Sequence, residues 1–171
     1  MHDERGNASV SWRDAPEDYE RPVLELRTFS KLYGLAGLRV GYGFGPVDVI
    51  DAIRRVQLPY NVNAMSQAAA LASVDLAGGI EERVRANVAG RQQLSAGLDK
   101  LGVSYAPSQT NFVWVHLGAR GLELVENMAV QGVLVRAGRG YDEPEYARVT
   151  IGLPEENDAF LRALEQALNT S

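Results

Sequence analysis

The sequence of 171 residues contains no cysteine and only two histidines. Without cysteine the chain can form neither a disulfide bond nor a thiolate metal site. Its histidines, His2 and His116, are too few and too far apart in the sequence to predict a metal cluster. No hydrophobic run reaches the length of a membrane span, and no apolar signal-peptide core follows the first residues. We therefore expect a cytoplasmic protein without a metal site and without membrane contact.

Charge and size narrow the class of protein further. The net charge of -5 argues against nucleic acid or an acidic membrane surface as a partner, although it leaves room for a local basic pocket that binds a phosphorylated ligand. The hydrophobic fraction of 46% and the charged fraction of 23% are ordinary for a globular protein. A chain of this length suits one domain, or one small domain with part of another.

The hydrophobic pattern of the first half predicts two strands followed by two helices. We expect the strands at 23–27 and 38–44 and the helices at 46–57 and 64–77. The second helix, capped by Asn63, is apolar almost all round, which is typical of a buried helix. Gly78 and Gly79 are expected to end it.

The second half of the chain begins with a long helix, predicted at 80–101, and continues as an α+β pattern that can form its own core. The predicted strands lie at 111–117, 133–136 and 147–151, and the predicted helices at 121–131 and 155–168. We expect a boundary between two domains within the long helix.

The most informative segment is the polar, glycine-containing loop between the first two predicted strands. Two hydroxyls, Thr28 and Ser30, and the guanidinium of Arg39 are suitable partners for a phosphate. Lys31, beside them, can form an imine with a carbonyl compound. Pyridoxal phosphate (PLP) combines an aldehyde with a phosphate and serves as an electron sink for carbanions. The residues alone still favour a simpler interpretation, an ordinary solvated Ser-Lys pair.

A second cluster of interest is formed by two arginines at predicted strand ends. Arg136 and Arg148 flank a glycine-containing loop and could converge on one anion. They could equally be surface arginines that neutralise the acidic residues at 142–145. The residues alone do not separate these two interpretations.

Two further patterns have simpler explanations than a binding site. The glycines at 41, 43 and 45 have the spacing G-x-G-x-G, which differs from a dinucleotide-binding fingerprint, and they indicate close strand packing. On the strand at 111–117, Phe112 and Trp114 are expected in the core. His116, on the same strand face, is expected to be packed or half-exposed.

The fifteen residues 28–42, TFSKLYGLAGLRVGY, resemble the lysine segment of the class I/II, fold-type-I PLP-dependent aminotransferases. They are most similar to the histidinol-phosphate aminotransferases. The resemblance continues in residues 54–63, and it returns at 108–112 and 148–152, which look like signatures of the family's small domain. It covers about residues 22–168 and corresponds to the C-terminal half of such enzymes.

The resemblance implies an α/β fold of fold type I. It implies that 22–80 form part of the PLP-binding large domain, with a mixed, mostly parallel sheet. Residues 81–171 would comprise the linking long helix and a small α+β C-terminal domain. Residues 1–21 are expected to be an irregular lead-in.

The resemblance also implies roles for the residues of the lysine loop. Lys31 would be the catalytic Schiff-base lysine, which binds the cofactor PLP and then carries a proton between the substrate carbon and the cofactor. Thr28, Ser30 and Arg39 would bind the cofactor phosphate. Asp3 is a weak candidate for the aspartate that pairs with the pyridine nitrogen, because the tyrosine of that family motif is absent here.

By the same resemblance, Arg148 would bind the anionic end of the substrate and Arg136 would add a second guanidinium when that end is a phosphate. Tyr60 would also contact the substrate. Two guanidiniums suit a phosphate dianion better than a carboxylate. The implied reaction is amino-group transfer between histidinol phosphate and 2-oxoglutarate, in histidine biosynthesis, by an enzyme that is a homodimer at full length and acts on small amino donors and keto acids.

Several alternatives stay open at this point. The chain could belong to another class I/II aminotransferase, acting on aromatic amino acids, or to a PLP enzyme resembling phosphothreonine decarboxylases. It could also be a non-catalytic fragment that retains the fold, because the family's N-terminal half supplies the ring stacked on PLP and other cofactor contacts. A nucleotide-binding α/β domain is the remaining alternative.

Overall fold

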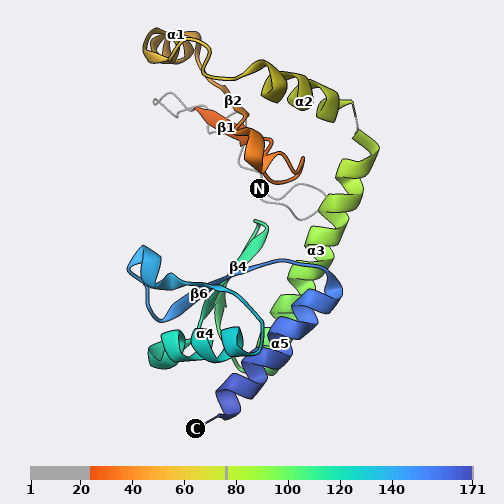
Figure 1. Ribbon diagram of the computed structural model, residues 1–171, viewed down its shortest axis with the longest axis vertical. Coiled ribbons are helices and arrows are strands. Elements are labelled where there is room, and N and C mark those ends of the chain that lie inside the picture. Colours follow the sequence, from red (N-terminus) through yellow and green to blue (C-terminus); the bar gives the residue numbers. More distant parts are fainter. Residues whose placement is uncertain (1–23, 76, 171) are drawn as a thin grey trace, which may run out of the picture. The chain divides into compact units, whose positions relative to one another are not determined.

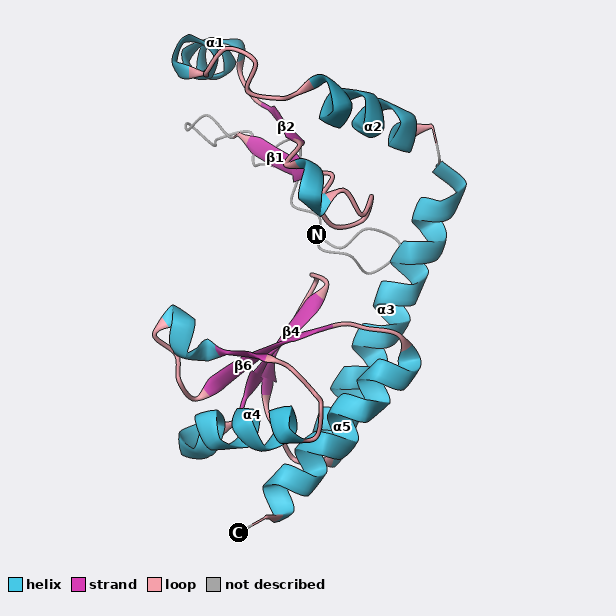
Figure 2. Cartoon of the chain, in the orientation of Figure 1, coloured by secondary structure: helices cyan, strands magenta, loops and turns pink. Residues whose placement is uncertain are grey.

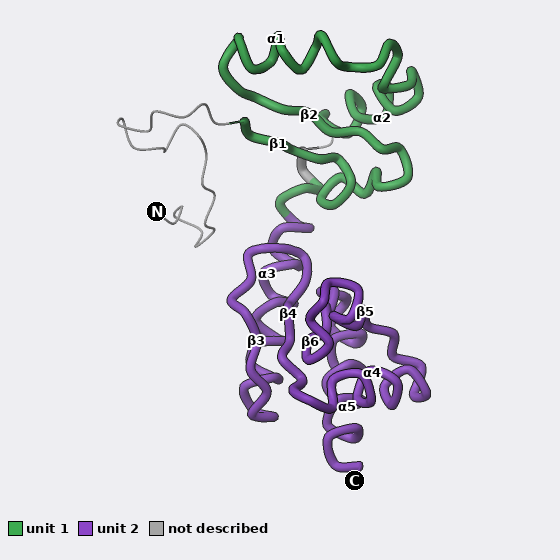
Figure 3. The backbone as a smooth tube through the Cα atoms, turned by 90° about the vertical axis from the view of Figure 1, so that its left-hand side faces the viewer, with its two compact units in different colours: residues 1–81 green, residues 82–171 purple. Residues whose placement is uncertain are grey.

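The computed structural model describes residues 24–75 and 77–170. The chain divides into two compact units, one up to Glu81 and the other from Glu82 onward (Figure 3). Each unit is described by itself. The predicted lead-in at 1–21 and the candidate Asp3 lie outside the described residues. None of the described helices combines the length and the apolar character that a membrane span requires.

The first unit contains one strand pair. Strand β1 (Glu25–Thr28) pairs antiparallel with β2 (Gly41–Phe44) (Figure 2). In this pairing Thr28 lies opposite Gly41. A Cβ atom on Gly41 would lie 2.6 Å from the carbonyl oxygen of Arg27, so this glycine permits close packing of the strands, as expected from its spacing. The parallel part of the predicted mixed sheet is not formed by the described residues.

The 3-10 helix η2 (Ala36–Leu38) lies between the two strands, and helices α1 (Val47–Val56) and α2 (Ala64–Val74) follow β2. Asn63 caps α2 as predicted, because its side-chain oxygen accepts a hydrogen bond from the backbone N–H of Ser66 at 2.8 Å. The predicted stop at Gly78 and Gly79 is wrong. Helix α2 ends at Val74, and both glycines lie in the first turns of the next helix.

The expected burial of α2 is also wrong for the described residues. Only Ser66 and Ala70 are buried, whereas Met65 is 78% and Leu71 is 71% exposed. The reason is the small size of the core available to this helix, which consists of Phe29, Val40 and Ala70 with a few partly buried neighbours. An apolar helix surface is buried only where other elements supply a surface to pack against.

The second unit is built on a four-stranded antiparallel sheet of order β3-β4-β6-β5, whose central strands β4 and β6 are labelled in Figure 1. Its strands are β3 (Tyr105–Ala106), β4 (Phe112–His116), β5 (Arg136–Ala137) and β6 (Tyr146–Thr150). Only the last residue of the strand predicted at 133–136 belongs to β5. Strand β3 was not predicted, since two residues are too few to show an alternating pattern.

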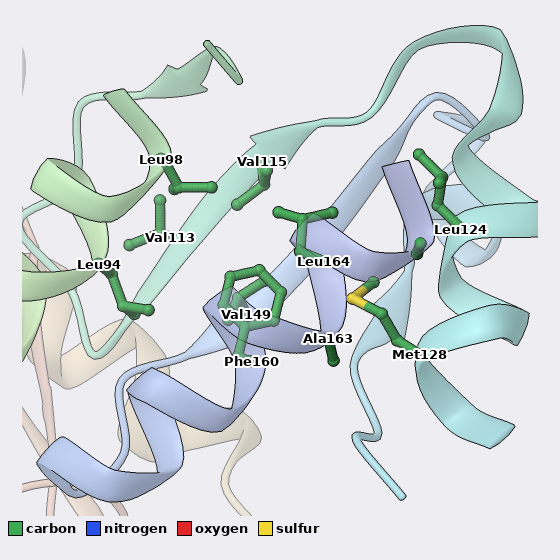
Figure 4. Packing of buried hydrophobic residues seen from close by; sticks show 11 residues of the cluster. Leu94, Leu98, Val113, Val115, Leu124, Met128, Val149, Phe160, Ala163 and Leu164 are labelled. Carbon is green, nitrogen blue, oxygen red and sulfur yellow. The ribbon is translucent and has the colours of Figure 1, made fainter. Parts of the chain in front are cut away.

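Helices α3 (Ala77–Lys100), α4 (Gly121–Val130) and α5 (Pro154–Asn169) contribute to one hydrophobic core with this sheet. Figure 4 shows that core, which is almost completely buried and includes Leu94, Leu98, Val113, Val115, Leu124, Met128, Val149, Phe160 and Leu164. Strand residues of alternate parity point to opposite faces. The other face therefore carries the side chains that lie between these valines.

The expectation that Phe112 and Trp114 lie in the core is wrong. Both are half-buried and alternate with the buried Val113 and Val115, so they belong to the opposite face of the sheet. His116 follows on that same face and is half-exposed, as expected. The hydrophobic core of the second unit lies on the sheet face that carries Val113 and Val115. The opposite face carries Phe112 and Trp114 and is called the aromatic face below.

Candidate functional site

The lysine loop of the first unit is closed at its base by Phe29, which is buried. The backbone N–H of Phe29 donates to the carbonyl of Val40 at 3.2 Å, and its carbonyl accepts from Leu35 at 2.9 Å. The Phe29 ring packs against Tyr33 with ring centroids 4.7 Å apart. These contacts hold the residues that follow Phe29 as a projecting turn, on which Lys31 is exposed.

The four residues predicted to bind the cofactor lie at the beginning of this loop (Thr28, Ser30 and Lys31) and at its end (Arg39). The Oγ1 of Thr28 accepts a hydrogen bond from the backbone N–H of Ser30 at 3.0 Å. Arg39 has a left-handed backbone conformation, with φ of 51°, and one of its terminal nitrogens donates to the carbonyl of Ala36 at 2.8 Å. Thr28, Lys31 and Arg39 are exposed and Ser30 is half-buried. The structure therefore places all four residues in the segment from the last residue of β1 to the residues just before β2.

Ser66 anchors this loop, and the sequence analysis did not single it out. Its hydroxyl donates to the carbonyl of Leu38 at 2.7 Å, and the residue is fully buried. The bond joins α2 to the 3-10 helix that precedes Arg39. The only signal in the sequence is a small polar residue in an alanine-rich helix.

Tyr60 lies in the turn between α1 and α2 and is 98% exposed. It therefore belongs neither to the lysine loop nor to the pair of Arg136 and Arg148. Its φ of 57° is unusual for a residue with a large side chain. Its predicted contact with the substrate stays a prediction.

The two predicted substrate arginines are brought together in the second unit. Arg136 on β5 and Arg148 on β6 are direct partners across the antiparallel ladder, so their side chains share one face of the sheet. The guanidinium carbon of Arg148 lies 5.5 Å from the centre of the Phe112 ring. Tyr141 contacts both arginines: its hydroxyl accepts from Arg148 at 3.3 Å, and its ring centre lies 5.1 Å from the guanidinium carbon of Arg136.

The acidic residues of 142–145 do not neutralise this pair. Within residues 24–75 and 77–170, neither Arg136 nor Arg148 forms an ion pair. Glu145 instead lies 3.4 Å from the Nε2 of His116. The Nε of Arg148 is shielded from solvent and has no hydrogen-bond partner in the described part of the chain. Of the two interpretations of the arginines, this geometry favours convergence on an anion.

The comparisons with known proteins identify the family. The family model "Aminotransferase class I and II" matches residues 5–164. The chain is 49% identical over 148 residues to a histidinol-phosphate aminotransferase of Methylobacillus flagellatus, covering 86% of the chain and 40% of that protein. It is 47% identical over 155 residues to an aromatic amino acid aminotransferase of Nocardia farcinica, covering 88% of the chain and 42% of that protein. The chain belongs to the class I and II aminotransferase family.

A comparison with a solved structure supports the assignment to this family. The histidinol-phosphate aminotransferase of Sinorhizobium meliloti, in complex with pyridoxal-5'-phosphate, matches with a TM-score of 0.76 and 26% identity, over 86% of this chain and 41% of that chain. The chain therefore has part of the fold of the fold-type-I aminotransferases. It spans about two fifths of the length of the curated relatives it matches. Nothing now supports the alternative of a nucleotide-binding domain.

The bond from Ser66 to the lysine loop gives a testable prediction. Replacing Ser66 by Ala leaves the carbonyl of Leu38, in a part-buried position, without its donor, which costs about 1–3 kcal/mol. Hydrogen exchange at the amides of Leu35 and Leu38, which bond within the loop, should accelerate by roughly tenfold or more. Ser73→Ala is the matched control, because the Ser73 hydroxyl bonds only to Ala70 in its own helix. Equal acceleration in both variants would show that Ser66 does not anchor the loop.

Proposed function

We propose that this chain is the C-terminal portion of a PLP-dependent aminotransferase and that Lys31 binds the aldehyde of the cofactor. Membership of the family and the PLP complex of the Sinorhizobium meliloti relative support the cofactor. The position of Lys31 supports its role: the residue is exposed near the beginning of a loop whose base is fixed by the buried Phe29.

The donors around Lys31 fit a phosphate group. Because the Thr28 oxygen accepts from the backbone of Ser30, its own proton is free to be donated to a ligand. Arg39 uses one terminal nitrogen on Ala36 and forms no ion pair within the described ranges, so further guanidinium donors remain. Hydroxyls and a guanidinium without a carboxylate partner match a phosphate dianion. We propose that Thr28, Ser30 and Arg39 bind the cofactor phosphate.

PLP, when bound, supplies an electron sink for the negative charge that develops on a substrate carbon. The contribution of Lys31 is then a positioned base, since its Nζ can take up the proton that leaves this carbon and return it later. Thr28, Ser30 and Arg39 hold the cofactor in place, so that the reacting carbon and the Lys31 nitrogen stay within reach of each other.

We propose histidinol phosphate and glutamate, with their keto forms, as the substrates of the full-length protein. The observation that carries this proposal is the cross-strand pair of Arg136 and Arg148, which has no carboxylate partner in the part of the chain that the structure describes. Both substrates carry an anionic group, a carboxylate in glutamate and a phosphate in histidinol phosphate. Arg148 is the main anion-binding residue, and Arg136 meets the additional charge of a phosphate.

Aromatic amino acids are the second candidate substrates. Relatives named aromatic amino acid aminotransferases are as similar to the chain as those named histidinol-phosphate aminotransferases. The face that carries the two arginines also carries aromatic rings, among them Phe112, Trp114 and Tyr141. With such substrates, Arg148 alone would bind the carboxylate of glutamate, which serves as the amino donor for both kinds of enzyme.

Several properties of the full-length protein follow from this proposal. Residues 22–80 belong to its PLP-binding large domain, and 81–171 comprise the linking helix and the small domain. The protein acts in histidine biosynthesis in the cytoplasm, as a homodimer, and Tyr60 contacts the substrate.

Lys31 can be tested directly, because the chain has only two lysines, Lys31 and Lys100. After incubation with PLP and reduction with borohydride, peptide mapping should find the pyridoxyl group on Lys31. Lys31→Arg should abolish this labelling, whereas Lys100→Arg should retain it, since Lys100 lies at the end of α3, outside the lysine loop. Equal labelling of both lysines, or labelling of Lys100 alone, contradicts the proposed role.

The roles of the two arginines can be distinguished by half-reaction kinetics. The measurement uses a full-length protein that contains this chain. Arg148→Ala should slow both the glutamate and the histidinol-phosphate half-reactions, because both substrates use the same anion site. Arg136→Ala should lower kcat/KM for histidinol phosphate by roughly ten- to a hundredfold, the value of one hydrogen bond to a charged group, and affect glutamate less.

Arg139→Ala serves as the control for this experiment. Arg139 is exposed in the same loop but is not part of the cross-strand pair. If Arg136→Ala slows both half-reactions equally, the argument for a phosphate substrate fails, and an aromatic amino acid becomes the better candidate.

A further inference from the structure

Tyr141 lies between the two arginines and contacts both. Its hydroxyl accepts a hydrogen bond from Arg148, and its ring lies against the guanidinium of Arg136. The ring also meets Trp114 edge to face, with ring centroids 5.5 Å apart and an interplanar angle of 85°. The residue is 44% exposed.

The backbone fixes the position of Tyr141. The residue ends the 3-10 helix η4 (Gly138–Tyr141), which begins directly after β5. Gly138 is buried, and a Cβ atom there would lie 2.1 Å from the carbonyl oxygen of Glu143. The N–H of Glu143 donates to the carbonyl of Gly138 at 3.1 Å, and Tyr146 in turn donates to Glu143 at 3.0 Å. The loop is thus folded tightly onto itself between the two arginine-bearing strands.

The hydrogen bond from Arg148 determines what the Tyr141 hydroxyl can do next. A phenol can donate one hydrogen bond while it accepts another. The oxygen of Tyr141 accepts from Arg148, and no acceptor for its proton lies among the described residues. The proton is therefore available to an anion that binds beside the guanidiniums.

We propose that Tyr141 is the third hydrogen-bond donor of the anion site and makes that site selective for phosphate over carboxylate. This inference rests on the proposed binding of an anion by Arg136 and Arg148. A phosphate dianion presents three oxygens to a protein, and two guanidiniums with one phenol supply donors for all three. A carboxylate has only two oxygens, which one guanidinium can occupy through its paired N–H groups. Removing the phenol hydroxyl therefore weakens phosphate binding specifically.

The test is an NMR titration of the 171-residue chain with inorganic phosphate and, separately, with acetate, at pH 8 and constant ionic strength. The Nε–H signals of Arg136 and Arg148 report binding at the site. Tyr141→Phe keeps the ring against Arg136 and removes only the hydroxyl. It should raise the Kd for phosphate roughly tenfold, the effect of one hydrogen bond to a charged partner, and change the Kd for acetate by less than about threefold.

Tyr146→Phe is the matched control, because Tyr146 stacks on Trp114 on the same face of the sheet. It should leave both dissociation constants unchanged. Arg148→Ala should weaken both anions. Backbone spectra that overlay with those of the unmodified chain show that each variant keeps its fold.

The outcomes separate this inference from the proposed function. If Arg148→Ala weakens phosphate binding and Tyr141→Phe does not, Tyr141 is no donor and the arginine site stands. If Tyr141→Phe weakens phosphate and acetate equally, the hydroxyl only orients Arg148, and the claim of selectivity is overturned. If Arg148→Ala leaves phosphate binding intact, or if the unmodified chain binds no phosphate, both the inference and the arginine site are overturned.

Discussion

Arg136 and Arg148 stand opposite each other in the pairing of β5 with β6, and no carboxylate of the described residues balances the charge of their guanidiniums. Like charges that face each other on neighbouring strands destabilise the pair. The rings of Phe112 and Tyr141 offset part of this cost, since cation–π contacts contribute about 0.5–1 kcal/mol at exposed sites. A bound anion would offset the rest of this electrostatic cost. The unbalanced charge of the two arginines therefore favours the binding of an anionic ligand.

The core on the other face of the sheet holds this arrangement in register. Ala147 and Val149, which flank Arg148 in the sequence, are both buried. Because side chains alternate along a strand, the register that buries these two residues necessarily turns Arg148 to the aromatic face. A slip by one residue would bury the guanidinium and expose the core. Packing by the helices thus positions the arginines without touching them.

Local features of the chain could be predicted from the sequence, whereas long-range contacts could not. The cap at Asn63 and the alternation along β4 depend on residues within a few positions of one another. Ser66 and Tyr141 act through partners 28 and 7 residues away, and no periodic pattern indicates such contacts. The exposure of α2 likewise depends on which elements pack against it, and its own apolar sequence does not specify them. The lysine loop is recognisable through its resemblance to a family, since its residues alone favour a simpler interpretation.

The most direct test of the account is the stability of the chain with and without inorganic phosphate, for the unmodified protein and for Arg136→Gln. The free energy of unfolding can be measured by denaturant titration at constant ionic strength. Without phosphate, Arg136→Gln should be at least as stable as the unmodified chain, because it removes the opposition of like charges. At a phosphate concentration of about a hundred times Kd, the unmodified chain should gain about 2.7 kcal/mol and Arg136→Gln clearly less, so that the order of stability reverses. Equal stabilisation of both proteins by phosphate, or none of either, would contradict the claim that the arginine pair is an anion site.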